Sequence, residues 1–371
     1  MSDAYQEYKK QFKKPIRQIA ELMPRDFTDD DFINKFKYVY PHLWNDIEWK
    51  YVQYNKYVIF LRKNKRRVRY EFKSPYELIK EQSYLFLRSH RKTSKRVILS
   101  NEEILSLEKT YRENSLTKLK KWKDELEQAV LLKQEIKPSY VNAFIKKYWS
   151  LDKCELHKKL EIIRELSKYL CDTVIIFFYL VNAAERNFSF HEEAMRYLQP
   201  LKMFFDLRGK KKGKKNFIDN EHVQNDSNPE ELMKRLFSDD LEKIKRYDVF
   251  ISHNSHDEDI IIKLYKTINT ANAVCYVDWV NDKYDLRREW CNATTAQVIK
   301  KRIQQSRYFV LVLTDSTLNS QWCPWELGYA DALEKEIYII KQTQKELPKY
   351  YECYHIASIE QFLSIIKSKS V

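Results

Sequence analysis

The chain has 371 residues with 43% hydrophobic content and a formal net charge of +14, and nearly all of the positive excess lies before residue 241. That length leaves room for two or three domains, and the hydrophobic content supports real cores. Only three glycines are present, where average usage of about 7% would give roughly 26, and this excludes the GxGxxG, P-loop and kinase glycine-loop classes of nucleotide-binding protein.

The first 207 residues are expected to form a mostly α-helical region, either as one domain or as two subdomains, 1–97 and 98–207. Apolar residues recur at spacings of three and four, which predicts helices at 29–38, 42–54, 75–89, 100–135, 140–145, 156–181 and 191–205. One segment differs, because the sequences YVIFLR at 57–62 and RVRYEF at 67–72 flank the polar sequence KNKR. This pattern predicts a β-hairpin, and helices followed by a basic hairpin would suit a winged helix.

A basic linker is expected at 208–245, between the helical region and the last domain. Its first part reads RGKKKGKKNFIDNEHVQNDSNP and holds two of the three glycines, a composition typical of a loop. A short helix with Pro229 at its start then leads to the C-terminal domain, which is expected to span 246–371.

The C-terminal domain alternates short apolar strands with amphipathic helices. Strands are expected at 247–252, 273–278, 308–313, 337–341 and near His355, and helices at 258–269, 294–305, around Glu326 and at 359–367. Short connections between strands and helices predict a parallel, doubly wound α/β sheet, and five strands suit a flavodoxin-like order.

The sequence SQWCPWE at 320–326 places Glu326 one helical turn after Trp322. Residues four apart share a helix face, so the carboxylate and the indole should face the same point. The preceding strand ends at Leu313, and open α/β sheets bind ligands beyond the carboxyl ends of their strands. The pattern indicates a site for a flat, charged, nucleotide-like molecule. Taken alone, it also suits an acidic residue placed at a helix start by the helix dipole.

Three blocks of sequence, in order, resemble the Toll/interleukin-1 receptor (TIR) domain in its bacterial form. They are YDVFISH at 247–253, CYVDW at 275–279, which resembles the start of the family's BB loop, and SxWCxxE at 320–326, which is similar to the motif of the catalytic glutamate in NAD-cleaving members. The resemblance leaves residues 1–240 unassigned. The loop 281–290 is charged and contains arginines, unlike the Pro- and Gly-containing loop of animal signalling members, so adaptor-type contacts are not implied.

The resemblance implies an NAD+ glycohydrolase that cleaves the nicotinamide–ribose bond, with NAD+ as substrate and without a cofactor or metal. Glu326 would be the catalytic carboxylate, opposite the positive charge that develops on the ribose. Substrate contacts are expected from Ser252, His253, Asp278, Trp279, Ser320 and Trp322; ordinary loop structure is the alternative for the first four. A synthase of cyclic ADP-ribose and a non-catalytic interaction module remain alternative functions.

The resemblance also implies an antiphage, abortive-infection effector that self-associates and is held inactive by its N-terminal region until triggered. Two basic clusters suggest the trigger, because Lys and Arg runs bind nucleic acid by releasing its counterions. They comprise Arg66, Arg67, Arg69, Lys210, Lys211, Lys212, Lys214 and Lys215. A nucleic acid or nucleoprotein, such as a retron-type reverse transcriptase with its DNA, is the expected partner; a solvated charged loop is the alternative.

The six cysteines form neither a CxxC pair nor a zinc-ligand spacing, and no secretory signal precedes them. They are expected to be reduced thiols in a cytoplasmic protein. The longest apolar run, 174–181, is too short for a membrane span, which needs about 20 residues, so no membrane association is expected.

Overall fold

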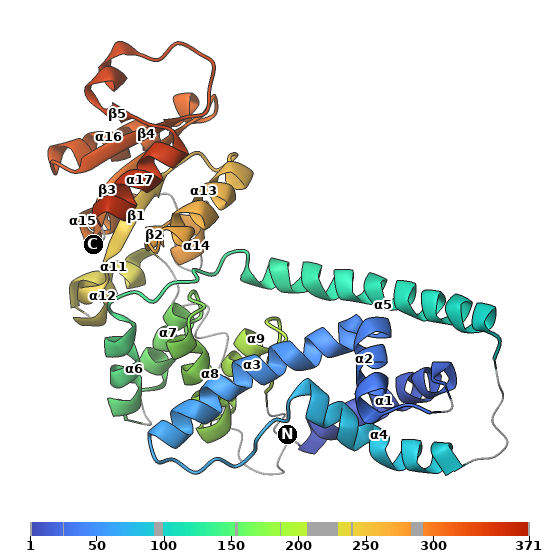
Figure 1. Ribbon diagram of the computed structural model, residues 1–371. Helices are drawn as coiled ribbons and strands as arrows, with labels where there is room; N and C mark the ends of the chain where they lie inside the picture. The colour runs from blue at the N-terminus through green and yellow to red at the C-terminus, as the bar shows by residue number, and fades with distance from the viewer. Residues whose placement is uncertain are drawn as a thin grey trace. The chain divides into compact units, whose positions relative to one another are not determined.

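The computed structural model describes residues 2–24, 26–92, 99–152, 155–185, 187–205, 229–238, 240–282 and 292–369. The chain forms two compact units, one from residues 1–130 and 175–214 and the other from residues 131–174 and 215–371. We call them the helical unit and the sheet unit (Figure 1). Residues 131–174, which the sequence places in the N-terminal region, therefore group with the sheet unit.

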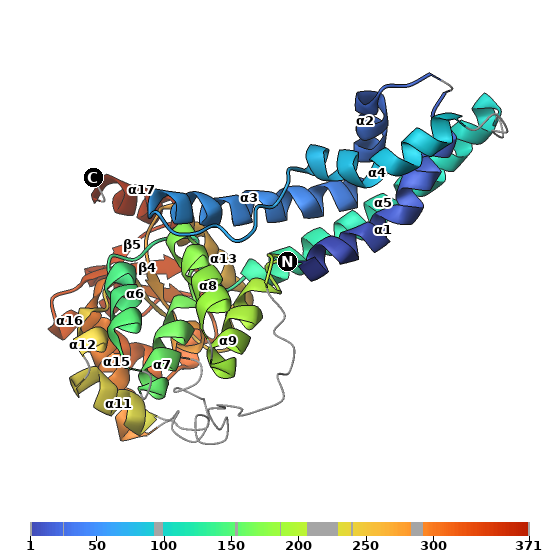
Figure 2. The same cartoon turned by 90° about the horizontal axis from the view of Figure 1, so that it is seen from below.

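The helical unit is built from long helices, which Figure 2 shows from below. Thr28 starts the second helix with a capping box, in which its hydroxyl accepts from the Asp31 backbone N–H at 3.1 Å and the Asp31 carboxylate accepts from the Thr28 backbone N–H at 2.9 Å. The first helix is not expected from the sequence and contains Pro15. The helices are α1 (Ser2–Leu22), α2 (Asp29–Val39), α3 (Pro41–Lys63), α4 (Pro75–Lys92), α5 (Asn101–Val130), α8 (Asp172–Ala184), whose first residues belong to the sheet unit, and α9 (Phe188–Leu198).

The predicted β-hairpin, and with it the winged helix, is wrong. Residues 57–62 continue α3, which begins with Pro41 at its first turn, and the described residues 64–74 contain no strand. Tyr57, Val58 and Leu61 are buried whereas Ile59 is 53% exposed, which is the spacing of a helix face. The five consecutive apolar residues 57–61 suit a strand as well as a helix, and here the packing of the long α3 face decides for the helix.

The sheet unit contains a five-stranded parallel sheet in the order β2-β1-β3-β4-β5, which confirms the flavodoxin-like prediction. The two edge strands are short, with two residues each. The strands are β1 (Tyr247–Ser252), β2 (Cys275–Tyr276), β3 (Ser306–Leu313), β4 (Glu336–Lys341) and β5 (His355–Ile356).

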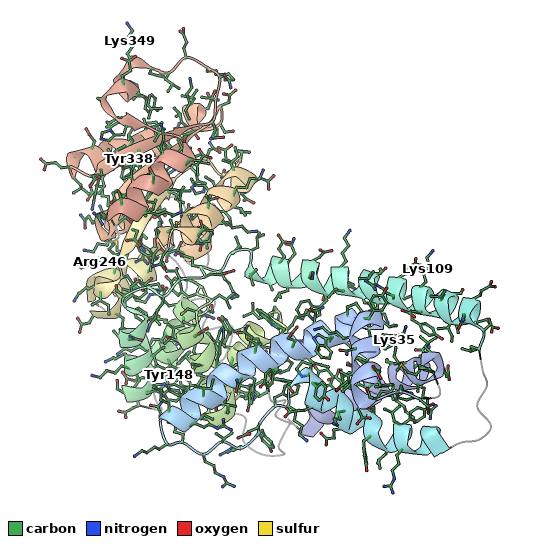
Figure 3. The ribbon with its side chains drawn as sticks, viewed as in Figure 1. Lys35, Lys109, Tyr148, Arg246, Tyr338 and Lys349 are labelled. Carbon is green, nitrogen blue, oxygen red and sulfur yellow. The ribbon has the colours of Figure 1, made fainter. Side chains whose placement is uncertain are left out.

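Helices cover both faces of this sheet. On one face α13 (Glu258–Thr270) and α17 (Ile359–Lys369) bury the main hydrophobic cluster, in which Tyr338, labelled in Figure 3, packs against Phe362. On the other face α15 (Ala293–Gln305) and α16 (Trp322–Ala332) contact β1 and β3. Shorter elements are α11 (Pro229–Ser238), α12 (Asp240–Ile244), α14 (Asp278–Asn281), η2 (Thr317–Asn319) and η3 (Lys349–Cys353).

Residues 131–174 add α6 (Val141–Ser150) and α7 (Leu156–Leu166) to the sheet unit. The helix expected at 156–181 is two helices, because residues 167–171 break it and Gln134 pairs there with Tyr169. The Gln134 side chain also pairs with the backbone of the edge strand β2: its oxygen accepts from Cys275 N–H at 2.9 Å and its amide donates to Cys275 C=O at 3.0 Å. Gln134 thus covers an edge that would otherwise present unpaired backbone groups.

A buried network of charges joins α7 to the sheet. Lys245, just before β1, donates to Glu165 of α7 at 2.9 Å and also pairs with Glu242. Arg302 of α15 is fully buried and donates to Glu242 at 3.0 Å and to Asp282 at 2.8 Å and 3.1 Å. Each charge therefore has an opposite partner inside the unit, as buried charges require. No helix within the described residues is long and apolar enough to cross a membrane.

Candidate active site

The structure brings Ser252 and Glu326 together from positions 74 residues apart. Ser252 is the last residue of β1 and pairs in register with Leu311 of β3, while Glu326 lies in the second turn of α16, the helix after β3. The Ser252 hydroxyl donates to the Glu326 carboxylate at 2.5 Å, and both residues are buried, with 1% and 9% exposure. The strand order reverses between β1 and β3, and α/β sheets of this kind bind ligands at that reversal.

Burial raises the pKa of Glu326 to about 8, and the nearby Asp278 charge adds to the shift. The hydrogen bond from Ser252 acts in the opposite direction, because it favours the ionised carboxylate. No cation pairs with Glu326 in the described residues to offset its desolvation. Without ligand, the carboxyl group is therefore mostly protonated at neutral pH, and a bound cation would promote its ionisation.

His253 and Trp279 are also brought together, at the ends of β1 and β2. The Trp279 indole donates to His253 Nε2 at 2.9 Å, and His253 Nδ1 lies 3.1 Å from the Ile251 carbonyl. An indole N–H can donate only to an unprotonated nitrogen, so the imidazole is neutral with its proton on Nδ1. For this reason the 3.7 Å approach of Asp278 to Nε2 is not an ion pair. Asp278 instead accepts from the Trp279 backbone N–H at 2.8 Å, which fixes the start of α14.

The two remaining predicted residues lie at the start of α16. Trp322 is the first residue of the helix, is half-buried, and meets Trp325 edge to face at 5.5 Å. The Ser320 hydroxyl accepts from the Cys323 backbone N–H at 3.3 Å, so Ser320 caps the helix. Trp325 stacks on Tyr329 and lies under Lys300 of α15, so this second tryptophan belongs to the contact between the two helices.

Several residues of this region are not expected from the sequence. The buried Cys323 thiol lies beside Ser252 and Glu326, and burial together with the Glu326 charge raises its pKa to about 11, so it is uncharged at neutral pH. Thr314 donates to Asp257 at 2.7 Å, and Asn254 donates to the Ser316 carbonyl at 3.0 Å. These bonds tie the loop after β1 to the loop after β3. In the sequence, the only sign of these two hydrogen bonds is a short polar residue, Asn254 or Thr314, soon after the end of each strand.

The basic clusters and the BB-loop region are only partly visible. Arg66, Arg67 and Arg69 are exposed on the segment after α3, whereas Lys210, Lys211, Lys212, Lys214 and Lys215 lie outside the described residues. Residues 283–291, most of the loop that resembles the BB loop, also lie outside them. Among the described residues, no group of three His, Cys, Asp or Glu side chains is arranged to hold a metal ion.

Comparison with known proteins identifies the sheet unit. The family model for the TIR domain matches residues 249–356. The chain is also 30% identical over 341 residues to the "Putative cyclic ADP-D-ribose synthase TIR2" of Cytobacillus dafuensis, an alignment that covers 91% of this chain and 89% of that protein. The chain belongs to the TIR-domain family. Because the alignment is far longer than the TIR domain, most of the remaining chain is shared with TIR2 as well.

Two further proteins match a shorter part of the chain. The "Probable 3' cyclic ADP-D-ribose synthase ThsB'" of Bacillus cereus (strain MSX-D12) is 33% identical over 99 residues, which are 27% of this chain and 51% of that protein. The solved TIR domain of the Toll-related receptor TRR-2 from Hydra magnipapillata is 18% identical, with 33% of this chain and 94% of that chain covered and a TM-score of 0.26. The predicted TIR membership and fold are confirmed.

Proposed function

We propose that this protein is an NAD+-cleaving TIR enzyme in which Glu326 stabilises the breaking of the nicotinamide–ribose bond. The observation that carries the proposal is a buried carboxylate at the reversal of the strand order that, among the described residues, accepts a hydrogen bond from a serine hydroxyl and has no cation beside it. A structural carboxylate at this depth would normally have a positive partner, as Glu165 and Asp282 have in the same unit. The lack of a positive partner for Glu326 within the described part of the chain suits a substrate that carries a positive charge.

In the proposed reaction, the electron pair of the C1′–N bond moves to the nicotinamide nitrogen, and nicotinamide leaves as a neutral ring. The ribose becomes an oxocarbenium-like cation, which the Glu326 carboxylate stabilises across a short distance of low dielectric. The leaving group needs no proton, so one carboxylate suffices where glycosidases use two. Ser252 holds the carboxylate in place, and His253 positions the Trp279 ring, because both of its ring nitrogens already contact protein atoms.

The second half of the reaction has two candidate outcomes. If water attacks the ribose cation and loses a proton to solvent, the product is ADP-ribose, as expected of a glycohydrolase. If a nucleophile of the same molecule attacks, the product is a cyclic ADP-ribose. The names of the two curated relatives favour cyclisation. Chromatography with mass spectrometry separates the two products, because the cyclic one is lighter by one water.

The first test compares bacterial cells that express the intact chain with cells that express Glu326→Gln, which keeps the shape of the side chain and removes its charge. We expect cellular NAD+ to fall and nicotinamide to rise only with the parent protein, with the variant losing about 100-fold or more of the activity. Glu334→Gln is the matched control, since it changes an exposed glutamate just beyond the other end of the same helix. Equal NAD+ loss with Glu326→Gln would contradict the assignment.

Activation belongs to the same proposal. We infer that TIR domains of neighbouring copies associate in the active state and that the helical unit restrains them until then. The protein would act in the cytoplasm, where NAD+ is available and thiols stay reduced. A specific rate that rises with protein concentration would support this association.

The proposal of a nucleic-acid trigger rests on the exposed Arg66, Arg67 and Arg69. If this proposal is right, the protein binds nucleic acid with an affinity that falls steeply as the salt concentration rises. Replacing these three arginines with Gln should reduce that affinity.

A further inference from the structure

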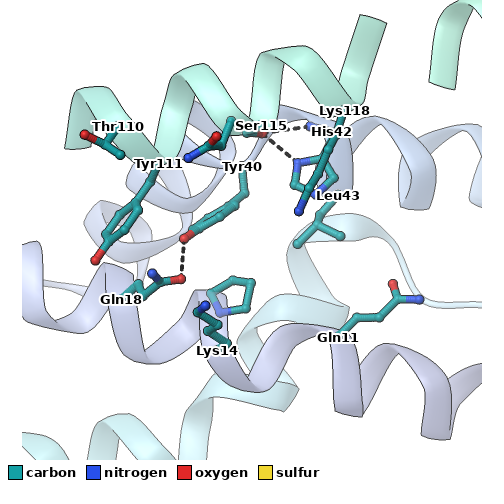
Figure 4. A pocket seen from close by; sticks show the side chains of 12 residues that line it. Gln11, Lys14, Gln18, Tyr40, His42, Leu43, Thr110, Tyr111, Ser115 and Lys118 are labelled. Carbon is teal, nitrogen blue, oxygen red and sulfur yellow. Dashed lines mark hydrogen bonds between the residues drawn. The ribbon is translucent and has the colours of Figure 1, made fainter. Parts of the chain in front are cut away.

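A pocket of about 640 Å³ is formed entirely by residues of the helical unit (Figure 4). Its walls come from α1, from the beginning of α3 and from the middle of α5. The volume falls within the range of about 300–1,000 Å³ that is typical of small-molecule sites. None of the residues that the sequence singles out lines this pocket.

The pocket carries positive charge without any acidic residue in its lining. Lys14 of α1 and Lys118 of α5 are the charged residues among the twelve that line it, and neither forms an ion pair within the described residues. Lys118 extends from α5 past His42 toward α1 (Figure 4). The nearby Asp46 does not line the pocket and already accepts hydrogen bonds from Tyr8 at 2.6 Å and Lys50 at 2.8 Å.

The N-terminus of α3 adds to this positive potential. Pro41 occupies the first turn of this 23-residue helix, and His42 and Leu43 after it line the pocket. The first turn contains no acidic residue and Tyr40 gives it no side-chain cap, although the backbone N–H of His42 donates a long hydrogen bond to the Ser115 hydroxyl at 3.5 Å. The partial positive charge of the helix end therefore remains available to a bound anion.

His42 supplies a neutral polar group beside the two lysines. Its Nδ1 lies 2.6 Å from the hydroxyl of Ser115, which is buried on α5. Burial, and next the Lys118 charge, lower the pKa of His42 to about 4, although Asp46 opposes the shift. At neutral pH the imidazole is a hydrogen-bonding group and not a third cation.

An aromatic surface lies next to the charges. The rings of Tyr40 and Tyr111 stack with their centroids 6.5 Å apart and an angle of 20° between their planes. The Tyr40 hydroxyl donates to the Gln18 side chain at 2.7 Å, which fixes that ring (Figure 4). The half-buried Tyr111 then offers an aromatic face on which a flat ring could stack.

We propose that this pocket binds a small phosphorylated molecule with a flat ring, of mononucleotide size. Its phosphate lies between Lys14 and Lys118 near the start of α3, and its ring packs on Tyr111. The proposal rests on the helical unit alone, so it holds or fails independently of NAD+ cleavage at Glu326.

The test is calorimetric titration of the full chain with AMP, GMP and UMP as probes. We expect at least one of them to bind at a single site in the parent protein. Lys14→Gln and Lys118→Gln should each weaken that binding about tenfold, the effect of losing one charged hydrogen bond. Lys109→Gln should leave it unchanged, since Lys109 of α5 (Figure 3) is exposed and lies about two and a half turns from Lys118, on the opposite side of the helix.

Two results would overturn the proposal. One is the absence of binding by all three probes up to about 1 mM, the weakest affinity that such a site should show. The other is binding that both lysine variants retain at full strength, which would place the nucleotide elsewhere, for example at the TIR site. Both lysines are exposed, so the variants should unfold at the parent's temperature, and a thermal scan verifies this.

Discussion

The two units differ in how deeply their most characteristic ion pairs are buried. In the helical unit, pairs such as Arg62–Glu71 and Lys73–Glu81 lie at the surface, where every side chain is roughly half exposed. In the sheet unit, Arg302 is completely buried between Asp282 and Glu242, and Lys245 is buried against Glu165. Surface pairs contribute little to stability, whereas a buried charge that loses its partner is strongly destabilising. Among the described residues, the most deeply buried ion pairs therefore lie in the sheet unit, whereas those of the helical unit range from partly buried, as in Lys50–Asp46, to exposed.

The largest effect is expected from Arg302→Met in the full chain. This change leaves Asp282 buried without its cation and should lower the free energy of unfolding by about 3–5 kcal/mol. Denaturant titration measures the loss, and Arg307→Met, at an exposed position on β3, is the control. A loss below about 1 kcal/mol would make the buried network no more important than a surface pair.

Gln134→Met tests whether the contact of residues 131–174 with the edge strand β2 stabilises the sheet unit. It leaves the N–H and C=O of Cys275 without partners at the edge of β2, so a loss of about 1–3 kcal/mol is expected in the same titration. Gln304→Met, at an exposed glutamine of α15, should change stability by less than about 0.5 kcal/mol. If the two variants are equally stable, the contact between Gln134 and β2 contributes nothing.

Glu326→Gln should stabilise the protein at high pH. The pKa of Glu326 is raised in the folded state, so the stabilisation from its bound proton is complete below the unfolded pKa and is lost as pH rises through about 8. A glutamine cannot ionise, and relative to neutral pH it should gain about 1.4 kcal/mol over the parent at pH 9. Thermal unfolding at pH 7 and pH 9 measures this gain. A constant difference between the two pH values would mean that Glu326 does not titrate in this range.

The smallest effect is expected in the helical unit. Arg62→Gln removes an ion pair with Glu71 in which both side chains are more than half exposed. The free energy of unfolding should change by less than about 1 kcal/mol, and added salt should reduce even that difference. A larger loss would show that the surface pairs of this unit support its fold after all.

The sheet could be predicted from the sequence because each strand and helix carries its own periodicity. The prediction failed where packing, and not the local pattern, decides where an element begins and ends. Residues 57–62 show five apolar side chains in a row followed by Arg62, but the 23-residue α3 decides their conformation. Residues 156–181 look like one continuous helix, and only the pairing of Gln134 with the 167–171 break reveals two. Contacts between distant segments of this kind leave no local trace in a sequence.

The candidate site was predictable only in part for the same reason. Glu326 and Trp322 follow from helical spacing, and Ser252 follows from the end of a strand. The bond between Ser252 and Glu326, the Trp279–His253 pair and the approach of Cys323 depend on how strands 1, 2 and 3 lie side by side. The pocket of the helical unit, with Lys14 and Lys118 drawn from helices far apart in the sequence, has no sequence motif at all.

The pH dependence of kcat/KM tests directly whether Glu326 acts as a carboxylate in NAD+ cleavage. It should be measured with the purified full chain, at a concentration where it is active, between pH 6 and 9. Since the pKa of Glu326 in the free protein is about 8, kcat/KM should rise about tenfold per pH unit below that value and level off above it. The residual activity of Glu326→Gln should show no such rise. If kcat/KM of the parent protein stays constant or falls as the pH rises from 6 to 9, Glu326 does not act as a carboxylate in the reaction.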